Sequence, residues 1–139
     1  MRLFRGFAVL LLTAAGTALA AAAEKPSITI PRVTEPPELA RYLDGSATPP
    51  GVRITGFVQR EPGDGVPSSL ETTAYLSYDD QHLYAVFVAR DDPGKVRANM
   101  TKREAIMGDD IVGLLLDTYH DGRRAYEFLV NPLGIQLDG

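Results

Sequence analysis

The rhythm of the chain after Pro50 constrains the fold more than any other feature of the sequence. Short runs rich in Val, Leu, Thr and Tyr alternate there with clusters of Asp, Gly and Pro, a pattern typical of strands joined by turns. Beyond residue 23 no stretch keeps the apolar period of about 3.6 residues that marks an amphipathic helix. We therefore predict an all-β fold over residues 51–139, an antiparallel β-sandwich or jelly roll.

The individual strands can be placed from these runs. The predicted strands cover residues 53–59, 70–78, 82–90, 111–119, 124–131 and 135–137. Residues 79–81 form a loop short enough for an antiparallel hairpin. Residues 83–89 are apolar on both faces, which predicts a central strand covered on both sides. Residues 95–104 alternate apolar and polar side chains, which favours a strand there over a helix.

The N-terminal end predicts export. Residues 1–23 begin with Arg2 and Arg5, continue with an apolar stretch and end in small residues that include Ala18-Leu19-Ala20, as in a cleavable signal peptide. The alternative is an uncleaved N-terminal anchor. Residues 24–50 hold more than half of the chain's 10 prolines and are expected to form a Pro-rich segment without a central strand.

Composition narrows the class of function. The net charge is −4 at pH 7 and becomes more negative once the signal peptide leaves, which argues against a nucleic-acid-binding protein. The chain has no Cys, so disulfides, thiolate metal sites and cysteine catalysis are excluded. The last predicted strand stops at residues 138–139, and we expect a truncated, incomplete domain because an open sheet edge is rarely left bare.

Three runs of sequence together resemble one family. They are LSYDDQHLYAVFVARD (residues 76–91), GDDIVGLLLDTYHD (residues 108–121) and YEFLVNPLGIQLDG (residues 126–139). Over residues 54–139 the chain resembles the family 9 carbohydrate-binding-module-like domain, found at the N-terminus of bacterial exported proteins with a C-terminal outer-membrane barrel-like region. The resemblance implies an antiparallel β-sandwich, glycan binding without catalysis, and a place in the periplasm or outer membrane of a Gram-negative bacterium.

Tyrosines are the candidate sugar platforms because the chain has no Trp. A tyrosine offers a flat apolar face with a polar rim, and five lie in or beside predicted strands: Tyr75, Tyr78, Tyr84, Tyr119 and Tyr126. The alternative is that they serve the core or the sheet surface. Together with polar residues beside turns, the predicted ligand-binding set is Tyr78, Arg103, Asp110, Tyr126 and Asn131.

Acidic residues at strand ends raise the possibility of a Ca²⁺ site, with Asp109 and Asp117 as the candidate ligands. The alternative is that Asp in such places serves turns through side-chain hydrogen bonds to the backbone. Asp117 is expected inside an apolar strand, where a carboxylate needs a partner such as Arg103, Arg123 or Arg124. The alternative to a ligand role is such an ion pair or a solvent-facing position near the strand end. Neither histidine has the neighbours of a catalytic triad or a zinc site, and we do not expect an enzyme.

Three functions remain open after the sequence alone. The first is a non-catalytic carbohydrate-binding-like module of an exported cell-envelope protein, with a glycan as partner. The second is a structural docking domain for the protein's own downstream outer-membrane region, with no sugar binding. The third is a fragment of a glycan-processing enzyme whose catalytic residues lie outside this sequence.

Overall fold

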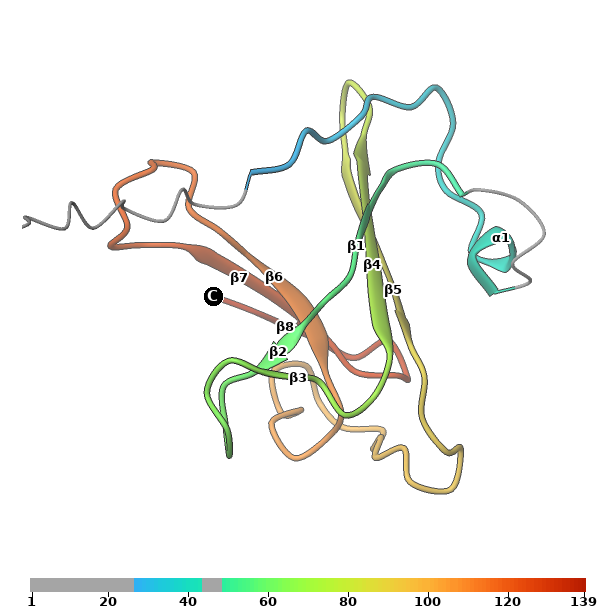
Figure 1. Cartoon of the computed structure of the whole chain (residues 1–139), viewed down its shortest axis with the longest axis vertical. Coiled ribbons are helices and arrows are strands. Elements are labelled where there is room, and N and C mark those ends of the chain that lie inside the picture. Colours follow the sequence, from blue (N-terminus) through green and yellow to red (C-terminus); the bar gives the residue numbers. More distant parts are fainter. Residues whose placement is uncertain (1–26, 44–48) are drawn as a thin grey trace, which may run out of the picture.

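The computed structural model describes residues 27–43 and 49–139, and it is built almost entirely of antiparallel strands (Figure 1). Its elements are α1 (Ala40–Leu43), β1 (Val52–Ile54), β2 (Val58–Gln59), β3 (Val66–Pro67), β4 (Thr72–Tyr78), β5 (Leu83–Ala89), β6 (Val112–Leu116), β7 (Tyr126–Val130) and β8 (Gln136–Asp138). The all-β prediction is confirmed. The predicted signal peptide, residues 1–23, lies outside the described residues.

The first sheet has the strand order β1-β4-β5. β4 and β5 form the predicted hairpin around residues 79–81, in a register that pairs Tyr75 with Val86. The prediction that residues 83–89 form a central strand is wrong, because β5 pairs only with β4 and is an edge strand. Apolar composition reports which faces of a strand are covered, whereas edge position depends on pairing between distant segments.

The second sheet has the strand order β6-β7-β8, and its two hairpins match the predicted strands. Leu114 pairs with Phe128 across the first hairpin, and Leu129 pairs with Leu137 across the second. Gly113 is required in β6, since a Cβ there would collide with the carbonyl oxygen of Phe128 and with the side chain of Leu129.

Two strand predictions are wrong. The single strand predicted over residues 53–59 is divided at Gly56, whose φ of 75° is left-handed, so that β1 joins the first sheet and β2 pairs with β3. Residues 95–104 contain no strand. The backbone N–H groups of Arg97 and Asn99 donate to the side chains of Asp110 and Asp109, so these groups are not available for a ladder.

The Pro-rich segment lies along the first sheet rather than within it. Tyr78 N donates to Pro31 O (3.1 Å) and Val33 N donates to Tyr78 O (2.8 Å), which ties the segment to the end of β4. Further along, Tyr42 in α1 packs edge-on against Tyr75, with ring centroids 4.9 Å apart. This contact covers the face of β4 that carries Tyr75.

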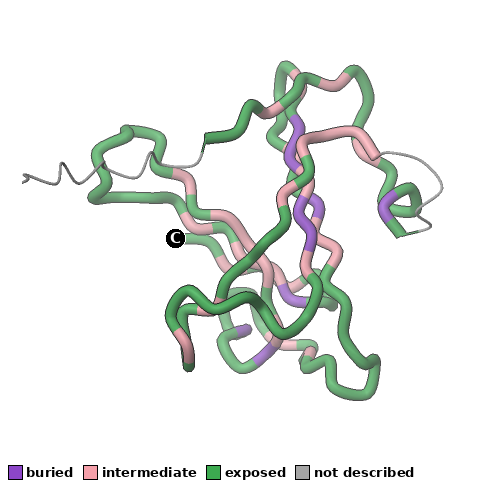
Figure 2. Tube along the Cα trace, viewed as in Figure 1, coloured by how far each residue is buried: buried purple, intermediate pink, exposed green. Residues whose placement is uncertain are grey.

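Burial is concentrated on the β4–β5 hairpin, whereas the second sheet is half-buried or exposed (Figure 2). Among the described residues, the buried apolar side chains are Tyr42, Ala74, Leu76, Val86 and Ile106, and only Ile106 is fully buried. The two three-stranded sheets face each other across a cavity, so their facing residues are incompletely covered. The finer expectation of a closed sandwich stays a prediction.

Candidate functional site

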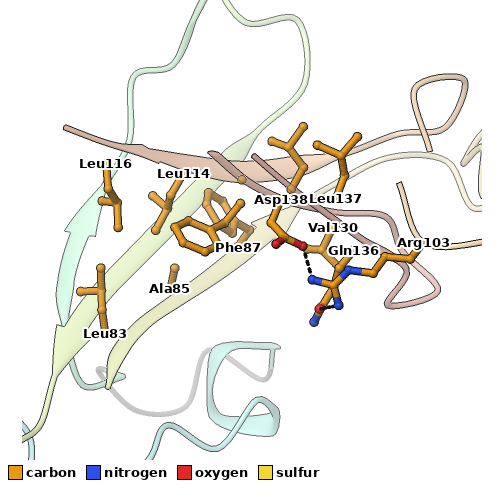
Figure 3. A pocket seen from close by; sticks show the side chains of 13 residues that line it. Leu83, Ala85, Phe87, Arg103, Leu114, Leu116, Val130, Gln136, Leu137 and Asp138 are labelled. Carbon is orange, nitrogen blue, oxygen red and sulfur yellow. Dashed lines mark hydrogen bonds and ion pairs between the residues drawn. The ribbon is translucent and has the colours of Figure 1, made fainter. Parts of the chain in front are cut away.

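A cavity of about 570 Å³ lies between the two three-stranded sheets (Figure 3). Its apolar lining comes from Leu83, Ala85 and Phe87 of β5 and from Leu114 and Leu116 of β6. These side chains converge because residues at alternate positions of a strand share one face of the sheet. The cavity is suited to apolar contacts, and residues of β7 and β8, among them Phe128 and Leu137, complete its lining.

One corner of this cavity is polar. The guanidinium of Arg103 forms an ion pair with the carboxylate of Asp138, and its Nη1 donates to Gln136 Oε1 at 3.4 Å (Figure 3). Both members of the ion pair are exposed. Arg103, predicted to contact ligand, therefore holds the loop before β6 against β8 in this structure.

A polar cluster joins the buried side chains of Asp109 and Asn131 to the exposed Asn99. Asn99 Nδ2 donates to Asp109 Oδ1 at 2.6 Å, while Asn131 Nδ2 and the Asn99 backbone N–H donate to Asp109 Oδ2 at 2.8 and 3.1 Å. Asp109 is only 8% exposed and Asn131 only 4%. These hydrogen bonds, with that from Asn131 the largest cause, lower the pKa of Asp109. The carboxylate is thus committed to fixing the loop onto the β7–β8 turn.

The carboxylate of Asp110 accepts hydrogen bonds from both the backbone and the guanidinium of Arg97. The backbone N–H of Arg97 donates to Asp110 Oδ2 at 2.9 Å, and its guanidinium donates to Oδ1 from Nη2 at 3.0 Å and from Nε at 3.2 Å. The backbone hydrogen bond from Arg97 is the main reason that the pKa of Asp110 is lowered. A sugar hydroxyl would have to compete with this guanidinium for the carboxylate.

Asp117 lies just after β6, at the start of the β6–β7 loop, and not inside a strand as predicted. Its Oδ2 accepts the backbone N–H of Gly122 at 2.7 Å, and its Oδ1 accepts those of Tyr119 and Asp121 at 3.1 and 3.3 Å. The Gly122 hydrogen bond is the main cause of its lowered pKa. Of the two alternatives to a ligand role, the position near the strand end fits the structure. Among the described residues no arginine pairs with this carboxylate, because backbone donors satisfy it instead.

Asp79 also accepts backbone hydrogen bonds within its own turn, the one that joins β4 and β5. It accepts the Tyr84 hydroxyl at 2.6 Å and the backbone N–H groups of Gln81 and His82 at 2.8 and 2.7 Å. The Tyr84 hydrogen bond, followed by that from Gln81, lowers the pKa of Asp79 to about 2. The same bond raises the pKa of Tyr84.

The structure divides the tyrosines into two groups. Tyr75 packs under Tyr42, and the hydroxyl of Tyr84 is bound to Asp79, so both serve structure. Tyr119 and Tyr126 are 65% and 51% exposed. Tyr119 lies in the loop of the β6–β7 hairpin, and Tyr126 begins β7 directly after that loop, which projects away from the first sheet in Figure 1.

A cationic side chain lies over the exposed ring of Tyr119. The guanidinium carbon of Arg124 lies 5.0 Å from the ring centroid, a cation–π contact. Asp121 Oδ1 accepts the backbone N–H groups of Arg123 and Arg124 at 2.8 and 3.2 Å, and its Oδ2 lies 3.7 Å from Arg124 Nη2. The hairpin loop therefore combines aromatic faces with a cationic donor and an anionic acceptor.

The predicted ligand-binding set is only partly brought together. Asn131 and Asp110 lie in one region, since Asn131 contacts Asp109 and Asp110 is its neighbour in the chain. Tyr78 ends β4 in the first sheet, Tyr126 begins β7 in the second, and Arg103 lies beside β8. The part played by Asn99 is not visible in the sequence, because its partners are distant in the chain. Sequence reasoning names Arg124 only as a partner of Asp117.

Metal binding by Asp109 and Asp117 stays a prediction. Among residues 27–43 and 49–139, no three side chains of Asp, Glu or His are grouped as a metal site would require. The hydrogen bonds described above account for the placement of both carboxylates. Those of Asp117 go to backbone N–H groups of its own turn, as the turn alternative predicted, whereas Asp109 binds the distant Asn99 and Asn131.

Within the described ranges, no helix has the length and apolar content needed to cross a membrane. Compared with known proteins, the chain matches no family model, no curated protein and no solved structure. The resemblance to family 9 carbohydrate-binding modules therefore rests on the three sequence runs.

Proposed function

We propose that this chain is a non-catalytic carbohydrate-binding-like module of an exported bacterial cell-envelope protein, and that the β6–β7 hairpin is its sugar-contacting surface. The observation that carries the proposal is the exposure of Tyr119 and Tyr126 on one hairpin, since the chain has no Trp to provide a stacking face. The resemblance of residues 54–139 to family 9 carbohydrate-binding modules and the signal-like residues 1–23 support it.

The chemistry of the hairpin suits a weakly bound sugar. An aromatic ring offers an apolar face to the C–H groups of a pyranose, and its hydroxyl remains available to water or ligand. Beside Tyr119, the guanidinium of Arg124 and the carboxylate of Asp121 are a donor and an acceptor for sugar hydroxyls. With few such contacts and the cost of association, the dissociation constant is expected on the order of millimolar, near −4 kcal/mol.

The rival function is a structural docking domain for a downstream outer-membrane region. The incompletely covered side chains at the cavity, such as Leu83 and Phe128, favour it because exposed apolar surface marks interaction sites. This rival predicts no response of the hairpin to sugar, so a binding assay separates the two.

The test is saturation-transfer NMR on mono- and oligosaccharides with the full chain and single variants. Tyr119→Ala and Tyr126→Ala each remove one stacking face and are expected to weaken binding about two- to tenfold, equivalent to ~0.5–1.5 kcal/mol. Tyr78→Ala, an exposed tyrosine on the other sheet, is the matched control and should leave binding unchanged. If no sugar binds, or if all three variants behave alike, the hairpin is not a sugar site.

A further inference from the structure

The free edge of β5 is unusually open. Arg90 N donates to Glu71 O at one end of the β4–β5 ladder, and Asp79 N donates to His82 O at the other. Because bonded pairs alternate along an antiparallel ladder, the even-numbered residues of β5 bond to β4. The odd-numbered ones direct their N–H and C=O groups to the free edge, and none has a backbone partner among the described residues: Leu83, Ala85, Phe87 and Ala89.

Among the described residues, none of the devices that usually block a sheet edge is found at β5. Proteins block exposed edges with charges, prolines, bulges or very short strands, yet the 7 residues of β5 contain no charge, proline or glycine. The free edge strands β1 and β8 have 3 residues each and carry Arg53 and Asp138, and β6 is shorter than β5, with 5 residues, and contains Gly113. Among the edges of the two three-stranded sheets, β5 is therefore the one best suited to pair with another strand.

The sequence of β5 is complementary to itself. Two antiparallel copies related by a two-fold axis must place a residue opposite its own copy, and the pairing that uses every outward backbone group is centred on Val86. In that register Leu83 lies opposite Ala89, and Phe87 lies opposite Ala85, so each large side chain on the cavity face meets an alanine. A register centred on Ala85 would place Ala89 opposite Gln81, and one centred on Phe87 would place Leu83 opposite Asp91. Both Gln81 and Asp91 lie outside the strand, so either register pairs fewer strand residues.

We infer that two copies of this chain associate by antiparallel pairing of their β5 strands about Val86. The pairing joins the β1-β4-β5 sheet of one copy to the same sheet of the other copy, which gives one continuous sheet with an isologous, closed interface. The partner's alanines cover the edge side of Leu83 and Phe87, which line the cavity between the sheets (Figure 3). The interface is separate from the tyrosines of the β6–β7 hairpin, so it does not depend on the proposed sugar binding.

Proline substitution at outward positions tests the interface without breaking the ladder within one chain. Ala85→Pro removes an N–H that faces the free edge of β5, so the β4–β5 bonds remain. Leu115→Pro is the matched control, because Leu115 is exposed and its N–H faces the free edge of β6. Far-UV circular dichroism should confirm that both variants keep the strand content of the parent chain.

Sedimentation equilibrium of the full chain should give a concentration-dependent mixture of monomer and dimer. Ala85→Pro removes two intermolecular hydrogen bonds and is expected to raise the dimer dissociation constant about tenfold or more, while Leu115→Pro leaves it unchanged. A parent chain that is monomeric at every concentration overturns the inference. So does dimerisation that Ala85→Pro leaves intact, or that Leu115→Pro abolishes.

A cysteine test reads out the register directly, because the chain contains no Cys and each variant has a single thiol. On the two-fold axis the Cα atoms of opposed residues lie about 4.5–5.5 Å apart, within disulfide range. Val86→Cys is therefore expected to form a covalent dimer on oxidation, whereas Val88→Cys, opposite Tyr84 of the other copy, is not. Cross-linking of Val88→Cys with none of Val86→Cys would refute the register.

Discussion

Replacing Asn131 should show how much of the stability comes from the polar cluster around Asp109. Asn131 Nδ2 donates to Asp109 Oδ2 and to Asn99 O, and its Oδ1 accepts the backbone N–H groups of Leu133 and Ile135. Each such bond contributes about 0.5–1.5 kcal/mol net. Asn131→Ala loses all of them, so we expect the free energy of unfolding to fall by about 2–6 kcal/mol, a large share of the usual 5–15 kcal/mol.

The assay is urea unfolding followed by far-UV circular dichroism, with the free energy obtained by linear extrapolation. Gln81→Ala, at an exposed turn position, is the control and should stay within about 0.5 kcal/mol of the parent chain. Asn131→Asp keeps the size of the side chain but places a second carboxylate beside Asp109. Its destabilisation should therefore ease as the pH is lowered and the pair shares a proton. An Asn131→Ala variant as stable as the control would refute the reasoning.

Two further predictions concern the turns and the second sheet. The pKa of Asp79 is lowered from 3.8 to about 2, so the carboxylate stabilises the fold fully above pH 3.8 and loses this effect as the pH falls towards 2. In a pH series of urea midpoints, Asp79→Asn should therefore show a smaller loss of stability at acid pH than the parent chain. An equal loss in both would contradict this role of Asp79. Gly113→Ala should lower the free energy of unfolding by about 1–3 kcal/mol, because the added Cβ overpacks against Phe128 and Leu129. Gly108→Ala is the control, since a Cβ there meets nothing within 4 Å. Equal effects of the two variants in urea unfolding would contradict the requirement for glycine in β6.

Local patterns predicted the hairpins well. Strand formers on both sides of residues 79–81 and of the β6–β7 loop identify segments that pair with their neighbours in the chain, and these pairings are present. The break at Gly56 was not predictable, because its positive φ serves the assignment of β1 and β2 to different sheets. The edge position of β5 was missed for the same reason: pairing between distant segments decides it.

In the candidate site, too, contacts between near neighbours in the chain were predictable and contacts between distant residues were not. Asp79 and Asp117 act on backbone groups within five residues, which is the turn chemistry that their sequence context indicates. The contact between Asp109 and Asn131 spans 22 positions, and that between Asn99 and Asn131 spans 32, so no local pattern reports them. Exposure of Tyr119 and Tyr126 likewise depends on which sheet faces are covered, and that follows from tertiary packing alone.

The most direct test of the proposed function is a ¹H–¹⁵N NMR titration of the full chain with oligosaccharides at concentrations up to tens of millimolar, chosen to exceed a dissociation constant on the order of millimolar. The proposal predicts saturable shifts confined to the β6–β7 hairpin, at Tyr119, Tyr126 and the intervening Asp121 and Arg124. Resonances of the β4–β5 turn, and of Tyr84 in the adjoining strand β5, should stay in place. Shifts that gather instead at the cavity residues of β5, or no shift with any sugar, would contradict it.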